Sequence, residues 1–459
     1  MGYLGEKASK FAHQYVMESP LVKNFLSRCD RTSEKTPEKI DQKNFVVDID
    51  SIKSEISNEL NRVVTVDAGY QEIILDDSYP TNRLCYYSIG ILCFSVKDLD
   101  NLEEQHTINP NDVGRLKNID RFHFVLPVQN IKLKQKDFIT TIRETIYQSF
   151  KDNKLGGETE DSSNSLLNTI KWLIFKSYAN GDGSIEIRCP SCGHSSQFKN
   201  KTNFYADSKN DFTDCDCGER IYITDCFQMY DLIDEINGSG PIISYVMSAF
   251  EVVLIFTLIR YALENNSKWL SETLFIKDGS LALFSKLDDF SYKVIRPFLQ
   301  FMYEKSKNEK TSYINLIGLE KSGMFMEHLR NTEATINENT ILTPSIDYIK
   351  KFITGDNKTN FGERTYFGIK SFVKKNKDLA FVLDISIPFG TNAQYGKYIE
   401  NPNINDCLNI QNILQLLFKL KCNMYDKSFI PIAILNKLVS LSSVPGKKIL
   451  TMFTKDELL

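Results

Sequence analysis

The segment RVVTVDAGYQEIIL (residues 62–75) opens the part of the chain that decides the fold. It is a run of β-branched residues with turn chemistry at Ala68-Gly69, a composition typical of a strand. RLCYYSIGILCFSV (83–96) and RFHFVLP (121–127) follow with the same character. Several strands that open a domain and are followed by helices indicate an α/β or α+β sheet.

A second decisive segment, TLFIKDGSLALF (273–284), predicts a strand, a tight turn and another strand. SYINLIGLEK (312–321) and DLAFVLDISIPF (378–389) predict further strands. Helices are expected near 52–60 and over 136–150, 410–422 and 429–443.

The chain has 459 residues, which corresponds to about three domain-sized units. We expect four regions. These are an N-terminal helical region at 1–60, the first part of a main domain at 61–164, a small cysteine-rich insertion at 165–232, and the second part of the main domain with C-terminal helices at 233–459.

The formal net charge is −4, which excludes a histone-like protein that binds nucleic acid by bulk charge. Nucleic-acid contact would need a local basic patch. One basic stretch, interleaved with Tyr366, Phe367 and Phe372, is either a track for a DNA backbone or a solvated face. Its basic residues are Arg364, Lys370, Lys374, Lys375 and Lys377.

The segment PIISYVMSAFEVVLIFTLIRYALE (241–264) is apolar over about a membrane thickness. Glu251 lies at its centre, where a carboxylate costs about 2.5–3.5 kcal/mol on membrane-insertion scales. We therefore expect a helix buried in a protein core and no membrane contact. The N-terminal segment lacks the apolar stretch of a signal peptide, so a reducing cytoplasm is the expected location.

Four of the ten cysteines form two tight pairs, Cys189-x2-Cys192 and Cys215-x-Cys217. The two pairs can share one tetrahedral ion, with each pair supplying two ligands from a tight turn. A glycine follows each pair where the chain must turn. The pattern predicts a structural Zn²⁺ site. The alternatives are four unrelated buried thiols, or a site in which His194 or Cys226 replaces one thiol.

Two acids share another pattern, because Asp67 and Asp278 each follow an apolar strand and precede a glycine turn. Carboxylates that converge at strand ends can bind Mg²⁺ or Mn²⁺, and such ions suit attack on a phosphodiester. Each acid alone is better explained as a turn residue in a hairpin, whereas the two together support a metal site as well as they support turns. Asp384 ends another apolar strand and is either a further member of this site or a strand-end cap.

Glu251 adds to this pattern, since a carboxylate inside an apolar helix is costly unless it is paired or binds a metal. It is either a third metal ligand or the partner of a basic group such as Arg260 or Lys277.

These residues carry a resemblance to the NurA nuclease family. VDAGYQ and KDGSLAL resemble its two signature motifs, with Asp67 on the first metal-binding Asp and Asp278 on the second motif. Glu251 corresponds to the intervening Glu, and Lys321 to the Lys of a later Gly-x-x-Lys strand end. The segment PIAILN resembles the family's C-terminal helix start, with Asn436 where the family usually has His. The resemblance covers residues 60–80 and 245–440 in pieces.

The resemblance implies an RNase H-like mixed sheet flanked by helices, with the zinc lobe as an insertion. It implies catalytic Mn²⁺ or Mg²⁺ held by Asp67, Glu251 and Asp278, with Lys321 and Asn436 as further catalytic residues. It also implies a homodimer that processes DNA ends with a HerA-type hexameric ATPase, in DNA repair or anti-phage defence. No phosphate-binding loop of the Gly-Lys-Ser/Thr kind occurs here, so a partner would have to supply ATP hydrolysis.

A second hypothesis is a non-catalytic DNA-binding or adaptor subunit of a HerA-type complex. Asn436 favours it, because an amide carries protons poorly.

Overall fold

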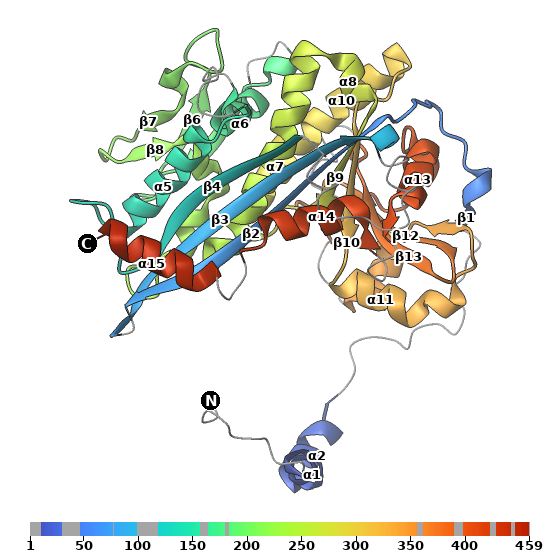
Figure 1. Ribbon diagram of the computed structural model, residues 1–459, viewed down its shortest axis with the longest axis horizontal. Helices are drawn as coiled ribbons and strands as arrows, with labels where there is room; N and C mark the ends of the chain where they lie inside the picture. Colours follow the sequence, from blue (N-terminus) through green and yellow to red (C-terminus); the bar gives the residue numbers. More distant parts are fainter. Residues whose placement is uncertain are drawn as a thin grey trace.

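The computed structural model describes residues 11–29, 46–76, 78–98, 118–156, 164–179, 183–355, 361–389, 398–422, 428–441 and 446–458. Its centre is a nine-stranded mixed sheet that runs through the molecule (Figure 1). Three two-stranded sheets accompany it.

The strands are β1 Val46–Asp48, β2 Arg62–Asp76, β3 Tyr79–Ser95, β4 Asn118–Gln129, β5 Ser184–Arg188, β6 Ser195–Lys199, β7 Phe212–Asp214, β8 Arg220–Tyr222, β9 Thr273–Asp278, β10 Asn315–Glu320, β11 Thr340–Leu342, β12 Ile369–Asn376, β13 Leu379–Ile385, β14 Lys421–Cys422 and β15 Ser428–Phe429. The α-helices are α1 Ala12–Glu18, α2 Pro20–Ser27, α5 Phe138–Asp152, α6 Leu166–Ile174, α7 Ile243–Asn265, α8 Ser267–Ser271, α9 Asp288–Phe290, α10 Arg296–Glu309, α11 Met324–Thr332, α12 Ile346–Tyr348, α13 Ile410–Lys419, α14 Ile430–Val439 and α15 Gly446–Leu458.

The order of strands in the large sheet is β1-β11-β12-β13-β10-β9-β2-β3-β4. β2, β3 and β4 form an antiparallel meander, and β9 and β10 run parallel to β2. The order β4-β3-β2-β9-β10 with these directions is the RNase H-like arrangement, so the expected fold class is confirmed. β13, β12, β11 and β1 extend it as antiparallel strands.

Helices cover the sheet on both faces (Figure 1). One core packs α5, α6 and α7 against side chains such as Val66, Tyr87 and Ile89. The other packs α11, α13 and α14 against side chains such as Val63, Leu92 and Ile276. Adjacent strand residues alternate between the two cores because successive side chains of a strand point to opposite faces.

Helix α7 is the central helix of the first core. In the described part of the chain, the helical stretch Gly240–Asn265 is the one candidate long and apolar enough to cross a membrane, and 72% of its most apolar window is buried inside the protein. Its apolar composition all round suits a helix enclosed by protein. This placement agrees with the expected core helix.

Four local expectations differ from the structure. Asp67 does not end its strand and Ala68-Gly69 form no turn, because β2 continues through them to Asp76. Residues 52–60 contain no helix; Ile52, Ile56 and Leu60 are instead buried one by one in an irregular segment. Residues 281–284 form an isolated bridge at Ala282 and no second strand. The basic stretch, expected to be exposed, contains the buried strand β12.

Candidate functional site

Asp67 and Asp278 lie side by side because of the register between two parallel strands. Val66 of β2 pairs with Lys277 of β9, so the acid that follows each of them occupies a neighbouring position. Asp67 is 6% exposed, and Asp278 is partly buried at the end of β9. The Asp67 Oδ1 atom accepts a hydrogen bond of 2.9 Å from the Ala68 amide. The sequence pattern therefore located two acids that meet in space.

Lys321 and Asn436 complete a chain of contacts around these acids. Lys321 follows β10, the parallel neighbour of β9, and its Nζ lies 2.6 Å from Asp278 Oδ2. With the Asn436 amide oriented to match its neighbours, Nδ2 donates to Asp67 and Oδ1 accepts from Lys321 Nζ at 2.6 Å. Four of the five predicted site residues are thus joined by direct contacts.

Two glycines let α14 bring Asn436 to this position. A Cβ at Gly69 would lie 2.7 Å from the Val439 carbonyl oxygen, and one at Gly90 would lie 2.6 Å from the Val439 side chain. Gly90 is the cross-strand partner of Asp67 in β3. The end of α14 therefore rests directly on the backbone beside the acid.

Glu251 comes from α7 on the other face of the sheet and forms an ion pair with Lys277. Their Oε2 and Nζ atoms are 2.9 Å apart, and both side chains are almost fully buried. Lys277 Nζ also donates to the Asp278 carbonyl oxygen at 3.1 Å. Of the two interpretations of Glu251, the structure contains the ion pair, with Lys277 as the partner.

Two of the acids, Asp67 and Glu251, have raised pKa values. The pKa of Asp67 is raised to about 7, mainly by burial and then by the charges of Asp278 and Glu251, while the Ala68 amide and Lys321 oppose the rise. Burial also raises the pKa of Glu251, and Lys277 opposes that shift. Like charges that destabilise one another in this way are relieved by a cation.

The turn after Asp278 is fixed by a close approach to β10. Gly279 has a φ of +91° and donates through its amide to the Leu319 carbonyl at 2.8 Å. A Cβ at Gly318 would lie 2.4 Å from the Gly279 carbonyl oxygen. Gly279 and Gly318 thus both allow the turn after β9 to lie directly against β10, and this contact holds Asp278 beside Lys321.

A second cluster, centred on the fully buried side chains of Lys370 and Asp384, adjoins this turn. Lys370 Nζ contacts Asp384 Oδ2 at 2.8 Å, Ser280 Oγ at 2.6 Å and the Glu320 carboxylate. Asp384 Oδ2 also accepts from the Leu281 amide at 2.9 Å. Asp384 therefore stabilises the turn at Gly279-Ser280 through the Leu281 amide and Lys370, and its described contacts do not include Asp67 or Asp278.

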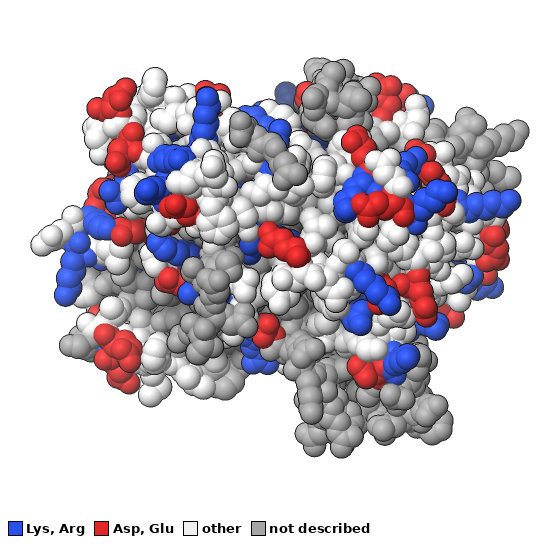
Figure 2. Space-filling view, turned by 90° about the horizontal axis from the view of Figure 1, so that it is seen from above, with Lys and Arg blue, Asp and Glu red and all other residues white. Residues whose placement is uncertain are grey.

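The basic stretch does not form a DNA track. Lys370 is fully buried, Lys374 is 8% exposed and donates to the carbonyl oxygens of Glu333 and Ile336, and the ring of Phe372 is buried. Arg364 pairs with Asp289. The face of the molecule in Figure 2 likewise shows basic and acidic side chains intermingled, without one uniformly basic field among the residues drawn.

The four predicted cysteine ligands form a compact cluster. Their Sγ atoms lie within 4.8 Å of one another, with 3.7 Å between Cys189 and Cys217 and 3.6 Å between Cys192 and Cys215. Sulfurs at about 2.3 Å from a tetrahedral zinc ion stand about 3.8 Å apart, so the spacing fits Zn²⁺. Among the described residues this is the one group of three or more acidic, His or Cys side chains that meets the spacing; the carboxylates of the acidic site stand further apart.

Two small hairpins carry the cysteines. One pair lies between β5 and β6 and the other between β7 and β8. Gly193 and Gly218 have φ values of +73° and +87°, and their amides donate to the carbonyl oxygens of Cys189 and Cys215. The His194 amide and the neighbouring thiols lower the pKa of Cys192 to about 7, which favours the thiolate that a metal requires, whereas the pKa values of Cys215 and Cys217 are raised.

Buried ion pairs attach this lobe to the main helices. Arg143 of α5 contacts Asp225 at 2.7 Å, and Lys171 of α6 contacts Asp211 at 2.7 Å. Both basic side chains are almost inaccessible, as are both acids. These ion pairs therefore hold the lobe in place, because separating either pair would leave buried charges without a partner.

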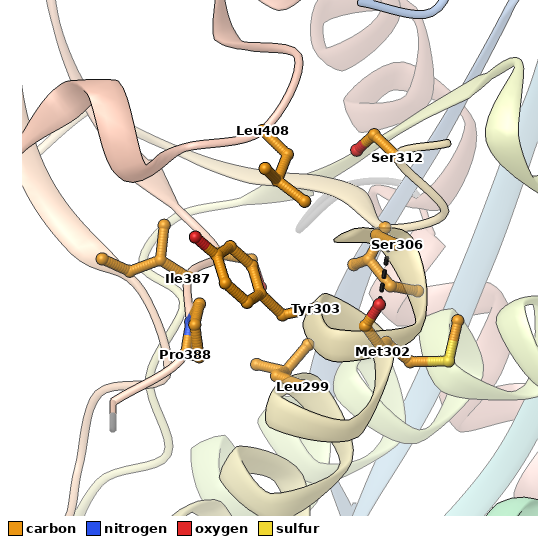
Figure 3. Close-up of a pocket in the computed structure, with 10 residues that line it drawn as sticks. Leu299, Met302, Tyr303, Ser306, Ser312, Ile387, Pro388 and Leu408 are labelled. Carbon is orange, nitrogen blue, oxygen red and sulfur yellow. Dashed lines mark hydrogen bonds between the residues drawn. The ribbon is translucent and has the colours of Figure 1, made fainter. Parts of the chain in front are cut away.

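A small pocket lies apart from these sites. It is lined by residues such as Leu299, Met302, Tyr303 and Pro388, and its volume is about 20 Å³ (Figure 3). This is about the space of one water molecule, so the pocket fits no substrate.

Sequence reasoning missed part of the surroundings of the acids. Ser280 and Glu320 lie within motifs already recognised, but their contact with Lys370 joins residues far apart in the chain. Lys370 lies in β12 between the apolar residues Ile369 and Phe372, and a charge in that position was the available signal.

Fold and side chains together define the class: an RNase H-like α/β protein with an acidic, lysine-bearing cluster on neighbouring parallel strands and a four-cysteine lobe. No known family matches the sequence, and neither does any curated protein. Solved structures similar to it include those of NurA nucleases. The crystal structure of the NurA nuclease from Sulfolobus solfataricus matches over 98% of this chain and 97% of that chain, at 10% identity and a TM-score of 0.35.

Two further NurA structures resemble the chain. One matches over 94% of both chains, at 9% identity and a TM-score of 0.28. The other, a NurA structure with manganese, matches over 96% of both chains, at 12% identity and a TM-score of 0.28. At these values the likeness leaves the function to be argued from the side chains.

Proposed function

We propose that this protein is a metal-dependent DNA nuclease of the NurA type. The observation that carries the proposal is the contact chain around Asp67 and Asp278, two acids on neighbouring parallel strands linked through Lys321 and Asn436. Two carboxylates and the partly exposed ammonium of Lys321 in one place suit a reaction that develops negative charge on a phosphate.

Asp67 and Asp278 would hold a divalent cation, with Glu251 adding negative charge from the opposite face of the sheet. Hard carboxylate oxygens suit Mn²⁺ or Mg²⁺. Burial, together with the charges of Asp278 and Glu251, raises the pKa of Asp67 to about 7, and a bound divalent ion would relieve this destabilisation of the carboxylate. When bound, the ion supplies an activated water and stabilises charge on the phosphate.

Lys321 and Asn436 would act on the substrate side. The Lys321 side chain is 39% exposed, so its ammonium can turn from Asp278 towards a phosphate oxygen. Asn436 holds that ammonium and Asp67 in one arrangement. Its amide orients them but does not carry a proton, so a base other than Asn436 would have to accept the proton of the attacking water.

The partners belong to the same proposal. DNA would be the substrate, and a HerA-type hexameric ATPase would deliver it to a homodimer in the cytoplasm, during DNA repair or anti-phage defence. Support comes from the missing phosphate-binding loop, since a processive end-processing enzyme without one needs an external motor. Zn²⁺ in the cysteine cluster would be structural, because four thiolates leave no open position.

The test is degradation of end-labelled linear DNA with Mn²⁺, with and without the ATPase. Asp278→Ala should reduce cleavage at least 100-fold and leave the melting temperature within a few degrees of wild type. Asp347→Ala, which removes an exposed acid of α12, is the matched control and should cut normally. Equal cleavage by Asp278→Ala and wild type would refute the assignment.

The adaptor hypothesis rests on Asn436, which replaces a proton-carrying residue at the centre of the site. It predicts that wild type binds linear DNA and the ATPase without releasing nucleotides at any Mn²⁺ concentration. The same assay therefore separates the two functions.

A further inference from the structure

Lys277 is a buried lysine in the wall between the acidic site and α7. Its side chain is 7% exposed, and its Nζ contacts Glu251 Oε2 at 2.9 Å and the Asp278 carbonyl oxygen at 3.1 Å. The Glu251 side chain is 6% exposed. Such a pair is held in place, because separating either partner would leave a buried charge uncompensated.

The pair changes the charge that a metal ion meets. Asp67, Asp278 and Glu251 supply three negative charges, while Lys277 and Lys321 supply two positive ones. One divalent ion balances Asp67 and Asp278, and Lys277 balances Glu251. Lys321 then remains as a single positive charge for one phosphodiester.

A second divalent ion would find no free carboxylate among these residues. It would also leave the site with more uncompensated positive charge than the single negative charge of one phosphodiester could neutralise. At the short separations inside a partly buried site, such an excess is strongly unfavourable.

We propose that Lys277 makes this a one-ion site: it takes the place of a second cation by binding Glu251, so that Asp67 and Asp278 alone hold a single Mn²⁺ or Mg²⁺. The inference rests on the proposed function and specifies it. Lys277 is a positioning residue, since it acts through Glu251 and the Asp278 backbone and does not touch substrate.

The experiment measures Mn²⁺ binding to the zinc-loaded, full-length protein by calorimetry and electron paramagnetic resonance. Wild type should bind one Mn²⁺ per chain at the acidic site. The double variant Glu251→Gln/Lys277→Met removes both charges of the pair and leaves the net charge unchanged. It should still bind one Mn²⁺, with an affinity within about threefold of wild type, whereas Asp278→Asn should bind it at least 30-fold more weakly.

A matched control is the double variant Lys171→Met/Asp211→Asn, which removes both charges of another buried lysine–carboxylate pair, between α6 and the cysteine lobe, and should keep one Mn²⁺ per chain. Two Mn²⁺ ions per wild-type chain, or a tenfold loss of affinity in a folded Glu251→Gln/Lys277→Met variant, would overturn the inference. If that variant does not fold, the wild-type stoichiometry alone decides. Wild type that cuts DNA with two bound ions would disprove the one-ion site and keep the nuclease, while wild type that binds no Mn²⁺ and cuts nothing would remove both.

Discussion

Asn436 contacts a carboxylate and an ammonium at once, which makes it the link between two motifs far apart in the chain. Pattern alone brought Asp67 and Asp278 to attention because each follows an apolar run and precedes a glycine, whereas only the family resemblance pointed to Lys321. The partner of Glu251 could be narrowed to Arg260 or Lys277 but not chosen, since that choice depends on the rotation of α7 against β9. At the scale of single residues, the sequence thus identifies the acids, and the packing decides their partners.

We expect Asn436→Ala to reduce kcat for Mn²⁺-dependent cleavage by about tenfold. The substitution removes a donor to Asp67 and an acceptor for Lys321, each a charge-assisted hydrogen bond worth about 1.5–3 kcal/mol at most. Steady-state cleavage of linear DNA measures the effect, and thermal melting should show little change because the side chain is partly exposed. An unchanged kcat would show that Asn436 has no part in orienting Lys321.

His328 predicts a pH dependence of stability. Its Nε2 hydrogen-bonds to Tyr348 Oη at 2.8 Å in a buried site, and burial lowers its pKa from 6.5. Below pH 6.5 the unfolded chain binds a proton that the folded chain binds less readily, so this contribution to stability is lost as the pH falls. His328→Gln keeps a partner for Tyr348 and should show a smaller drop in melting temperature from pH 7.5 to 5.5 than wild type. Equal drops would contradict the prediction.

The elements of the site were predicted where the apolar pattern was unbroken. The runs at 62–75 and 273–278 became β2 and β9, and 241–264 became α7. β12 was missed because two buried lysines interrupt its pattern, and their carboxylate and carbonyl partners lie on other elements. Residues 52–60 have apolar residues at helical spacing, but the chain there is irregular, with Asn58 bonded to the Asn409 side chain and the Ser312 carbonyl.

The packing of α14 against β2 and β3 can be tested by substituting two glycines, Gly69 and Gly90. At Gly69 a methyl group would meet the Val439 backbone carbonyl at 2.7 Å, whereas at Gly90 it would meet the ends of the Val439 and Leu435 side chains. We expect Gly69→Ala to cost about 1–3 kcal/mol of unfolding free energy and to reduce cleavage, since the helix that carries Asn436 must move. Gly90→Ala should cost less because side chains can rotate away. Denaturant unfolding of both variants checks the order, and the reverse order would contradict it.

At the scale of the whole molecule, two cores share one sheet, and the acidic site lies where residues from both meet. Glu251 and Lys277 face the core of α7, while Asn436 comes from α14 on the other side. The cysteine lobe belongs to the first core, because Ile187, Cys189 and Ile221 pack into it together with α7. Loss of the lobe would therefore disturb the helix that carries Glu251.

Zinc removal tests this connection. We expect one zinc ion per chain by elemental analysis, retained in His194→Ala and Cys226→Ser and lost in Cys192→Ser, because His194 and Cys226 lie outside the four-thiol cluster. Since zinc closes both hairpins and Arg143 and Lys171 tie them to α5 and α6, its removal by a chelator should lower the melting temperature by several degrees or more. Cleavage should fall with it even when Mn²⁺ is restored in excess. A zinc-free protein that melts and cuts like wild type would mean that the cysteine cluster stabilises nothing beyond its own two hairpins.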